Sequence, residues 1–389
     1  MTWLDVLLVG VSIGAFAIFI SVVVMGLTWI ERKVMAHLQA RRGPTKTGPF
    51  GLLQPIADAI KLLSKEDFMP GKTDKLSFWI APVVVFAPAF MVWVTIPFTR
   101  NIVIANLDLG LLYILAIMGV SIVGMLMAGW ASANKYSALG GARAAAQLIS
   151  YELPMVLGVL GVVMIAGTAD LRGIVGSQNV PFILLQPLGF VLVFLAGLAE
   201  VGRTPFDIPF AESELMGGPF LEYSGIHWAM FQLAEYAGTF LVAILSTLLF
   251  LGGWRGPWSP ADGIGAEIMM AFWLFSKAMV VFMVIIWIRA TIPRFRIDQL
   301  MGLAWKVFVP LSFVNVLITA FYLFYHWPDW TITVMSLATL GATWWLINRG
   351  RRKTPRPSLR TVKVMPRVAA TVAAAPAKEA APAAGTAGG

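Results

Sequence analysis

The chain has 389 residues, of which 58% are hydrophobic and only 13% are charged. A soluble domain carries about 25% charged residues, so this composition, with a mean hydropathy of +0.79, predicts a polytopic membrane protein and excludes an ordinary soluble enzyme. The sequence has no cysteine, which excludes disulfides, thiolate chemistry and cysteine-ligated iron–sulfur clusters in this chain. The three histidines are scattered, so no metal site is predicted. The net charge of +9 is explained by the excess of basic residues in cytoplasmic loops, without a nucleic-acid partner.

Nine apolar segments approach the length of about 20 residues that crosses a bilayer. The first is not expected to be a signal peptide, because its apolar run from Val6 to Ile30 exceeds the about 7–15 residues of a signal's core. The sequence predicts an all-α polytopic membrane protein with eight core transmembrane helices, an additional ninth and a cytoplasmic interfacial amphipathic helix. The nine segments lie near 4–30, 78–98, 108–130, 143–167, 181–199, 227–252, 267–288, 304–326 and 330–347.

Lysine and arginine fall mainly on one side of this nine-helix alternation. One side holds 23 of them, and the other holds Arg100, Arg172 and Arg255. Because cytoplasmic loops are enriched in these residues, we expect the N-terminus outside, the C-terminus in the cytoplasm and the protein in the bacterial inner (plasma) membrane.

The stretch "GLLQPIADAIKLLSKED", residues 51–67, is too short to span the membrane. Leu52, Ile56, Ile60 and Leu63 fall on one helical face, a pattern typical of an amphipathic helix in the membrane interface. Two roles stay open for it: sealing against neighbouring helices, or facing a ligand.

The stretch "GRTPFDIPFAESELMGGPFLEY", residues 202–223, gathers carboxylates around a single arginine, Arg203, on the side that is otherwise basic. Acidic residues contribute little to membrane topology, so the cluster needs another explanation. A local ion pair between Arg203 and Asp207, shaping a turn bounded by prolines, is one interpretation. The acids of this region are Glu200, Asp207, Glu212, Glu214 and Glu222.

Three ionisable residues are predicted at membrane depth. Glu152 and Glu235 lie about 15 Å and about 12 Å from the cytoplasmic ends of their helices at 1.5 Å per residue, and Lys277 lies within the seventh span. Each costs at least ~2.5 kcal/mol at the bilayer centre unless it is hydrated or paired. Lys277 could pair with one of the glutamates. Alternatively, the glutamates continue inward from the acidic loop as a row of carboxylates that holds and passes protons.

Five stretches carry a resemblance to a known family. The chain closely resembles the quinone-site membrane subunit of respiratory complex I, the H subunit of the proton-pumping NADH:quinone oxidoreductase, from its first helix to about residue 326. The stretches are "ERKVMAHLQARRGPTKTGPFGLLQPIADAIKLLSKED" (31–67), "GWASANKYSALGGARAAAQLISYE" (129–152), "AEVGRTPFDIPFAESELMGGPFLEYSG" (199–225), "LAEY" (233–236) and "WIRATIPRFRIDQLM" (287–301).

The resemblance implies that the first, the amphipathic and the sixth helices wall a chamber that ubiquinone or menaquinone enters from the lipid. It implies a relay of acidic residues that couples quinone chemistry to pumping: Glu152, Glu200, Asp207, Glu212, Glu214, Glu222 and Glu235. The residues expected near the chamber are Glu31, Arg32, Gln54, Asp58, Arg203, Phe206 and Tyr236. The chain departs from many relatives at Val201 and Gly202, and at Phe210, where many relatives have an acid.

The resemblance also implies a membrane component of an enzyme complex, with no redox centre of its own and no covalent or metal cofactor. Quinone would be the substrate, with flavin and iron–sulfur clusters only in partner subunits. The expected partners are the hydrophilic-arm subunits that carry the terminal iron–sulfur cluster and the rest of the quinone site, small and antiporter-like membrane subunits, and the lipid bilayer.

Other functions stay open at this stage. A membrane-bound hydrogenase or a coenzyme-F420 or ferredoxin-oxidising complex uses a similar subunit. A stand-alone proton-coupled transporter would use the buried acids as its ion site, although no internal repeat is evident. A scaffold without chemistry would leave the cost of the buried acids unexplained. The expected organisation is a membrane domain over 1–326, an additional helix over 327–348 and a basic, then Ala/Pro-rich, disordered cytoplasmic tail over 349–389.

Overall fold

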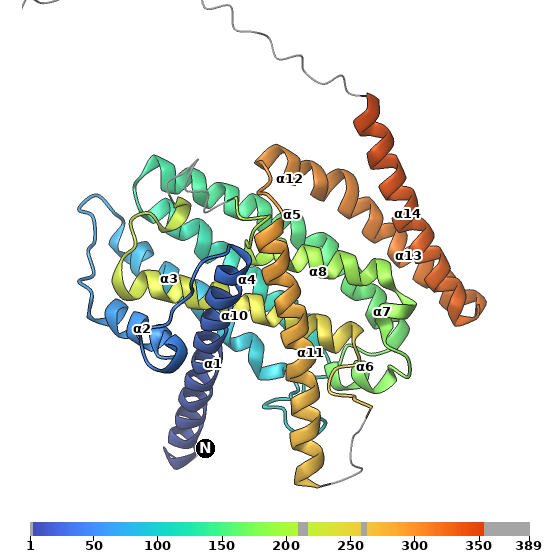
Figure 1. Ribbon diagram of the computed structural model, residues 1–389, viewed down its shortest axis with the longest axis horizontal. Coiled ribbons are helices and arrows are strands. Elements are labelled where there is room, and N and C mark those ends of the chain that lie inside the picture. The colour runs from blue at the N-terminus through green and yellow to red at the C-terminus, as the bar shows by residue number, and fades with distance from the viewer. Residues whose placement is uncertain (1–2, 209–216, 258–262, 354–389) are drawn as a thin grey trace, which may run out of the picture. The chain divides into compact units, whose positions relative to one another are not determined.

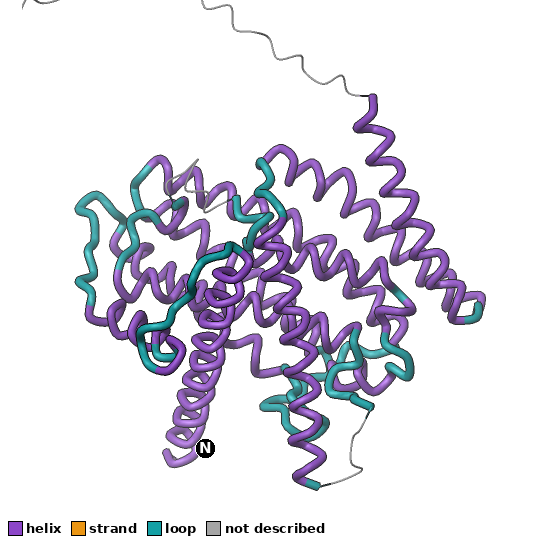
Figure 2. The backbone as a smooth tube through the Cα atoms, in the orientation of Figure 1, coloured by secondary structure: helices purple, strands orange, loops and turns teal. Residues whose placement is uncertain are grey.

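The computed structural model describes residues 3–208, 217–257 and 263–353. The chain divides into a main unit, Met1–Gly341, and a second unit, Ala342–Gly389. Within the described ranges every regular element is a helix (Figure 2). The predicted all-α class is therefore confirmed.

Eight described helical segments are long and apolar enough to cross a membrane. The seventh joins α12 (Ile297–Leu303), a π-helical turn (Ala304–Phe308) and α13 (Val309–Tyr325). These spans confirm a polytopic membrane protein. The others are formed by α1 (Trp3–Leu38), α3 (Lys75–Met91), α4 (Gly110–Ala131), α5 (Lys135–Ala166), α10 (Gly225–Phe250), α11 (Ile264–Thr291) and α14 (Asp329–Lys353).

The predicted fifth span is instead a broken, interior element. It consists of α7 (Phe182–Leu185) and α8 (Pro187–Val201), with Gln186 between them at φ −128° and ψ 64°. The break follows from Pro187, which lacks a backbone N–H and disfavours helical geometry in the residue before it. α8 has only 15 residues, and most of them are buried among the helices around it. In the described part of the chain, eight long helices and a short buried one thus stand where nine full spans were predicted.

The predicted amphipathic helix is present as α2 (Gln54–Ser64), after a 3-10 turn at Pro49–Gly51. Its apolar side chains remain open: Ile56 is 45% exposed, Ile60 61% and Leu63 66%. α2 therefore does not use this face to seal against other helices of the main unit.

The central helix is α10, which packs against α1, α3, α8 and α11 (Figure 1). Every residue from Thr239 to Phe250 is buried, as expected for a helix that is hydrophobic on all sides. The start of α10 is more polar and carries Glu235 and Tyr236. This helix therefore brings a carboxylate into the middle of the helix bundle.

The additional helix predicted over 327–348 is observed as α14, which continues to Lys353. Most of the basic and Ala/Pro-rich tail, residues 354–389, lies outside the described residues, so its predicted disorder stays a prediction.

Candidate functional site

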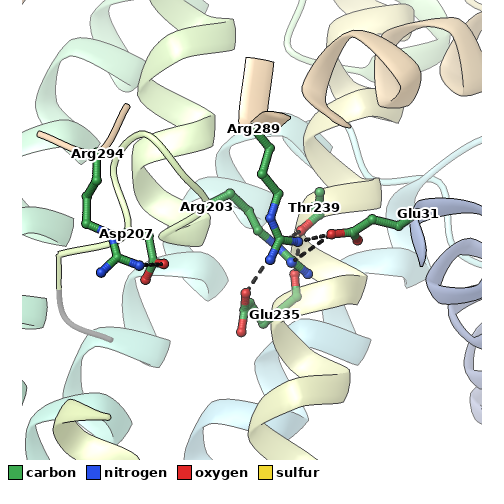
Figure 3. Close-up of polar contacts among 7 residues, drawn as sticks. All are labelled: Glu31, Arg203, Asp207, Glu235, Thr239, Arg289 and Arg294. Atoms are coloured by element: carbon green, nitrogen blue, oxygen red, sulfur yellow. Dashed lines mark hydrogen bonds and ion pairs between the residues drawn. The ribbon is translucent and has the colours of Figure 1, made fainter. Parts of the chain in front are cut away.

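A buried network of arginines and glutamates links α1, α10, α11 and the loop that follows α8. Glu31, near the end of α1 that its charges predict to be cytoplasmic, is only 5% exposed. Arg289 of α11 forms an ion pair with its Oε1, and Arg203 Nη1 lies 3.5 Å from the same atom. Figure 3 shows both guanidinium groups converging on this carboxylate.

Arg203 also connects the network to α10. Its Nε lies 3.1 Å from Glu235 Oε1 and donates to Thr239 Oγ1 at 3.1 Å. Its guanidinium stands 4.0 Å from the centre of the Tyr236 ring, a cation–π arrangement. Burial opposes the charge of Arg203, but Glu235 and Tyr236 outweigh it and raise the pKa of the guanidinium above its ordinary value. Arg203 therefore stays charged, and two arginines balance two glutamates.

The backbone after α8 explains why Arg203 points inward. α8 ends at Gly202, whose φ of 74° belongs to the left-handed region that glycine adopts readily at helix ends. Phe206 then anchors the loop: it is 2% exposed and packs against the rings of Tyr151 and Phe295. The glycine turns the chain, and the buried ring holds Arg203 on the side of α10.

The predicted local pair between Arg203 and Asp207 is wrong as a direct ion pair. Asp207 Oδ2 instead accepts from Arg294 Nη2 at 2.6 Å. Figure 3 shows this pair well apart from the contacts of Arg203. Arg203 therefore faces Glu31 and Glu235 in the bundle, whereas Asp207 faces the segment after α11.

A cavity of about 100 Å³ lies beside the network, among α3, α4, α5, α8 and α10. Its walls are mainly apolar, but they include Glu235, Glu200 and Gln147. Glu200 Oε2 and Gln147 Oε1 are buried without a hydrogen-bond partner among the described residues. Since one water needs about 10–15 Å³ of such space, the cavity can hold several waters that would satisfy these atoms.

Glu152, the carboxylate predicted in the fourth span, lies near Glu200. Glu152 Oε1 lies against Gly119 of α4, at a point where a side chain would clash with it, and its charge is close enough to interact with Glu200. α5 begins at Lys135 rather than near Ala142, so Glu152 lies about 25 Å along its helix, against about 15 Å for Glu235 along α10. The predicted similar distance of the two glutamates from the starts of their helices is therefore wrong, because α5 starts earlier than expected.

A family model described as NADH dehydrogenase matches residues 11–320. Over 303 residues the chain is 50% identical to the H subunit of NADH-quinone oxidoreductase from Dehalococcoides mccartyi (strain CBDB1), covering 78% of this chain and 83% of that protein. The protein of the same name from Geobacillus kaustophilus (strain HTA426) is 49% identical over 312 residues, covering 79% and 92%. The chain belongs to this family. It is a membrane subunit of respiratory complex I, as its sequence motifs predicted.

The remaining acids expected in the relay lie apart from this network or outside the described residues. Glu222 accepts a hydrogen bond from Asn134 Nδ2 at 2.7 Å, next to the start of α5. Glu212 and Glu214 lie outside the described residues, as does Phe210. Glu200 and Glu235 line the cavity, and Glu152 lies close enough to Glu200 for their charges to interact.

Three of the residues expected near the quinone chamber form a separate polar group where α1 meets α2. Arg32 pairs with Asp58, and Gln54 Nε2 donates to Asp58 Oδ1 at 3.0 Å. A shallow surface hollow opens beside Arg32 and Gln54, and Arg41 and Arg42 also line it. Phe206, in contrast, is enclosed by aromatic rings and acts as an anchor of the loop.

Lys277 is paired with no glutamate among the residues that the structure describes. Its Nζ donates to three backbone carbonyls, of Leu251, Gly253 and Arg255, at 2.7, 3.1 and 2.6 Å. These carbonyls belong to the C-terminal end of α10 and the turn that follows, where carbonyl groups lack helical partners and attract cations. The alternative in which Lys277 pairs with a glutamate is therefore wrong for the described residues, and the lysine stabilises a helix end instead.

Sequence reasoning did not single out Arg289, Arg294 or Gln147 as site residues. The arginines were counted only as topological charges, and Gln147 lies in a run of small residues that suggests close helix packing. Their positions in the helices were the features that could have identified two of them. Arg289 is in the last turn of α11, and Gln147 lies five residues before Glu152 in the same helix.

Proposed function

We propose that this chain forms part of the quinone-binding chamber of complex I and couples quinone reduction to proton translocation. The observation that supports this most directly is the position of Glu235. Its carboxylate pairs with Arg203 in the buried network and also lines the cavity that holds Glu200. The Glu235 side chain thus joins the charge-balanced network to a cavity that can hold water.

The proposed coupling follows from charge balance. Reduction of a quinone to a quinol takes up two electrons and two protons. Electrons that arrive first create negative charge, which attracts the guanidinium of Arg203. A shift of that cation weakens its pair with Glu235, and a buried carboxylate without its cation favours the protonated state. A proton taken up at Glu235 can pass through cavity water to Glu200 and then to Glu152.

The electrons would come from an iron–sulfur cluster in a hydrophilic-arm subunit, because this chain has no cysteine to ligate one. The open apolar face of α2 and the hollow beside Arg32 support an entrance for the quinone between α1 and α2. The other proposed neighbours are the small and antiporter-like membrane subunits and the lipid bilayer. The proposed location is the bacterial inner membrane, with the N-terminus outside.

The names of the relatives favour NADH as the source of electrons over the hydrogenase and F420 or ferredoxin alternatives. A stand-alone transporter receives no comparable support, because each of the relatives compared is named as a component of a larger enzyme.

Replacement Glu235→Gln in the assembled complex tests this function. We expect proton pumping in membrane vesicles to fall by about tenfold or more, because glutamine cannot take up and release the proton, while NADH oxidation by an artificial acceptor stays normal. Glu200→Gln and Glu212→Gln should act in the same direction. Glu267→Gln, in the first turn of α11 and away from the network, is the control. Full pumping in all three relay variants would overturn the proposal.

A further inference from the structure

Gln147 of α5 holds the backbone of the site at two points. Its side chain is 2% exposed. Its Nε2 donates to the carbonyl oxygen of Ala199 at 2.7 Å and to that of Phe206 at 2.7 Å. The first carbonyl is at the end of α8 and the second is in the loop beyond it. The Gln147 amide therefore bridges the two ends of the segment 199–206.

Each of these carbonyls directly precedes an acidic residue. Glu200 follows Ala199, and Asp207 follows Phe206. Arg203 lies between the two points that Gln147 holds. A shift of the amide would therefore move the backbone that carries all three charged side chains.

The two donor contacts also fix the orientation of the amide. The amide oxygen of Gln147 has no hydrogen to donate, so only Nε2 can contact the carbonyl oxygens of Ala199 and Phe206. Oε1 must therefore face away from these two carbonyls. Gln147 lines the cavity that Glu200 and Glu235 share, and its Oε1 is buried without a protein donor among the described residues. This oxygen can only accept, either from a water or from a protonated carboxyl group.

We propose that Gln147 is a positioning residue of the proton path. Its Nε2 fixes the loop that carries Glu200, Arg203 and Asp207, and its Oε1 orders the water or protonated carboxyl group between Glu200 and Glu235. This inference rests on the proposed proton-coupling function and adds a neutral group to a path otherwise made of ionisable ones.

Two substitutions of similar size test the inference in the assembled complex. Gln147→Met removes both donors and the acceptor. Gln147→Glu keeps the acceptor but can donate only when its carboxyl group is protonated. Gln178→Met is the matched control, because Gln178 is also buried and its Nε2 also donates to two carbonyls, those of Leu248 and Leu249, at the other end of α10.

We expect Gln147→Met to lower the number of protons pumped per NADH oxidised by about tenfold, because it releases the loop that carries Glu200, Arg203 and Asp207 and removes the acceptor that lines the cavity. Gln178→Met should keep the wild-type ratio. The pumping ratio of Gln147→Glu should rise as the pH is lowered, whereas that of Gln147→Met should show no such recovery. Oxidation of NADH by an artificial acceptor reports assembly of each variant.

Pumping by Gln147→Met within twofold of the wild type would overturn the inference, and so would a pH profile of Gln147→Glu that matches that of Gln147→Met. If Gln147→Met does not assemble, Gln147→Glu is compared with the wild type, and a pumping ratio relative to the wild type that does not rise as the pH is lowered would overturn the inference. These failures are distinct from failure of the proposed function, which would appear as full pumping in Glu235→Gln, Glu200→Gln and Glu212→Gln.

Discussion

Arg289 of α11 and Glu31 of α1 form an ion pair between two membrane helices that are far apart in the sequence. Arg203 approaches the same carboxylate oxygen of Glu31. The pair therefore connects the end of α11 with the loop after α8 and, through Arg203, with Glu235 of α10. A change of charge at any one of these residues alters the electrostatic environment of the others.

The first prediction concerns this connection. Glu31→Gln and Arg289→Gln should each lower the free energy of unfolding by about 1–3 kcal/mol, because each removes a charge-assisted contact, while Arg203 stays near Glu31 and water reaches Arg289. The double variant should be less destabilised than the sum of the two single variants, since no unpaired charge remains. Thermal unfolding of the detergent-solubilised complex measures this coupling. Strictly additive effects would show that the two residues do not interact in the protein.

The second prediction concerns the geometry of Arg203. Arg203→Lys keeps the charge, but one ammonium group cannot reproduce the planar set of donors that contacts Glu31, Glu235 and Thr239. We expect quinone reduction by NADH to fall by about tenfold or more, with normal oxidation of NADH by an artificial acceptor. Arg100→Lys, an exposed substitution away from the network, should have no effect. Wild-type quinone reduction in Arg203→Lys would show that charge alone suffices at this position.

The third prediction concerns the cavity. Ser121→Leu adds apolar volume to a space of about 100 Å³ and should displace water between Glu200 and Glu235. We expect fewer protons pumped per NADH oxidised. Ser121→Ala leaves the space open and should pump normally. Equal pumping by the two variants would mean that protons do not pass through this cavity.

The fourth prediction separates stability from coupling at Lys277. Lys277→Met leaves three carbonyls without their donor and should lower stability by about 1–3 kcal/mol for each one that stays buried and unpaired. The ratio of protons pumped to NADH oxidised in the surviving complex should not change. Lys306→Met, at an exposed lysine, provides the control for thermal stability. A normal unfolding temperature with a reduced pumping ratio would instead place Lys277 in the proton path.

Local patterns in the sequence determined most of the fold. Continuous apolar runs predicted the long helices, because crossing a bilayer requires a fixed length of apolar helix. The spacing of Ile56, Ile60 and Leu63 predicted α2. The family motifs also identified the type of complex, since they are long and lie in the loops. Each of these properties is contained in a short, continuous piece of chain.

The structure decided what those pieces contact. Hydropathy alone could not show that α8 is a short helix enclosed by others, because an apolar run has the same composition whether lipid or protein surrounds it. The same limit applies to charges. Lys277 binds backbone carbonyls instead of a carboxylate, and Asp207 binds the distant Arg294 instead of the nearby Arg203.

The sequence by itself determined which ionisable groups this protein carries and roughly where along its helices they lie. Only the tertiary structure decided that Glu31, Arg203, Glu235 and Arg289 form one network and that Gln147 holds the loop beside it. The physical reason is distance. Ion pairs and hydrogen bonds act over a few ångströms, and the residues that come within that range are set by the packing of helices far apart in the chain.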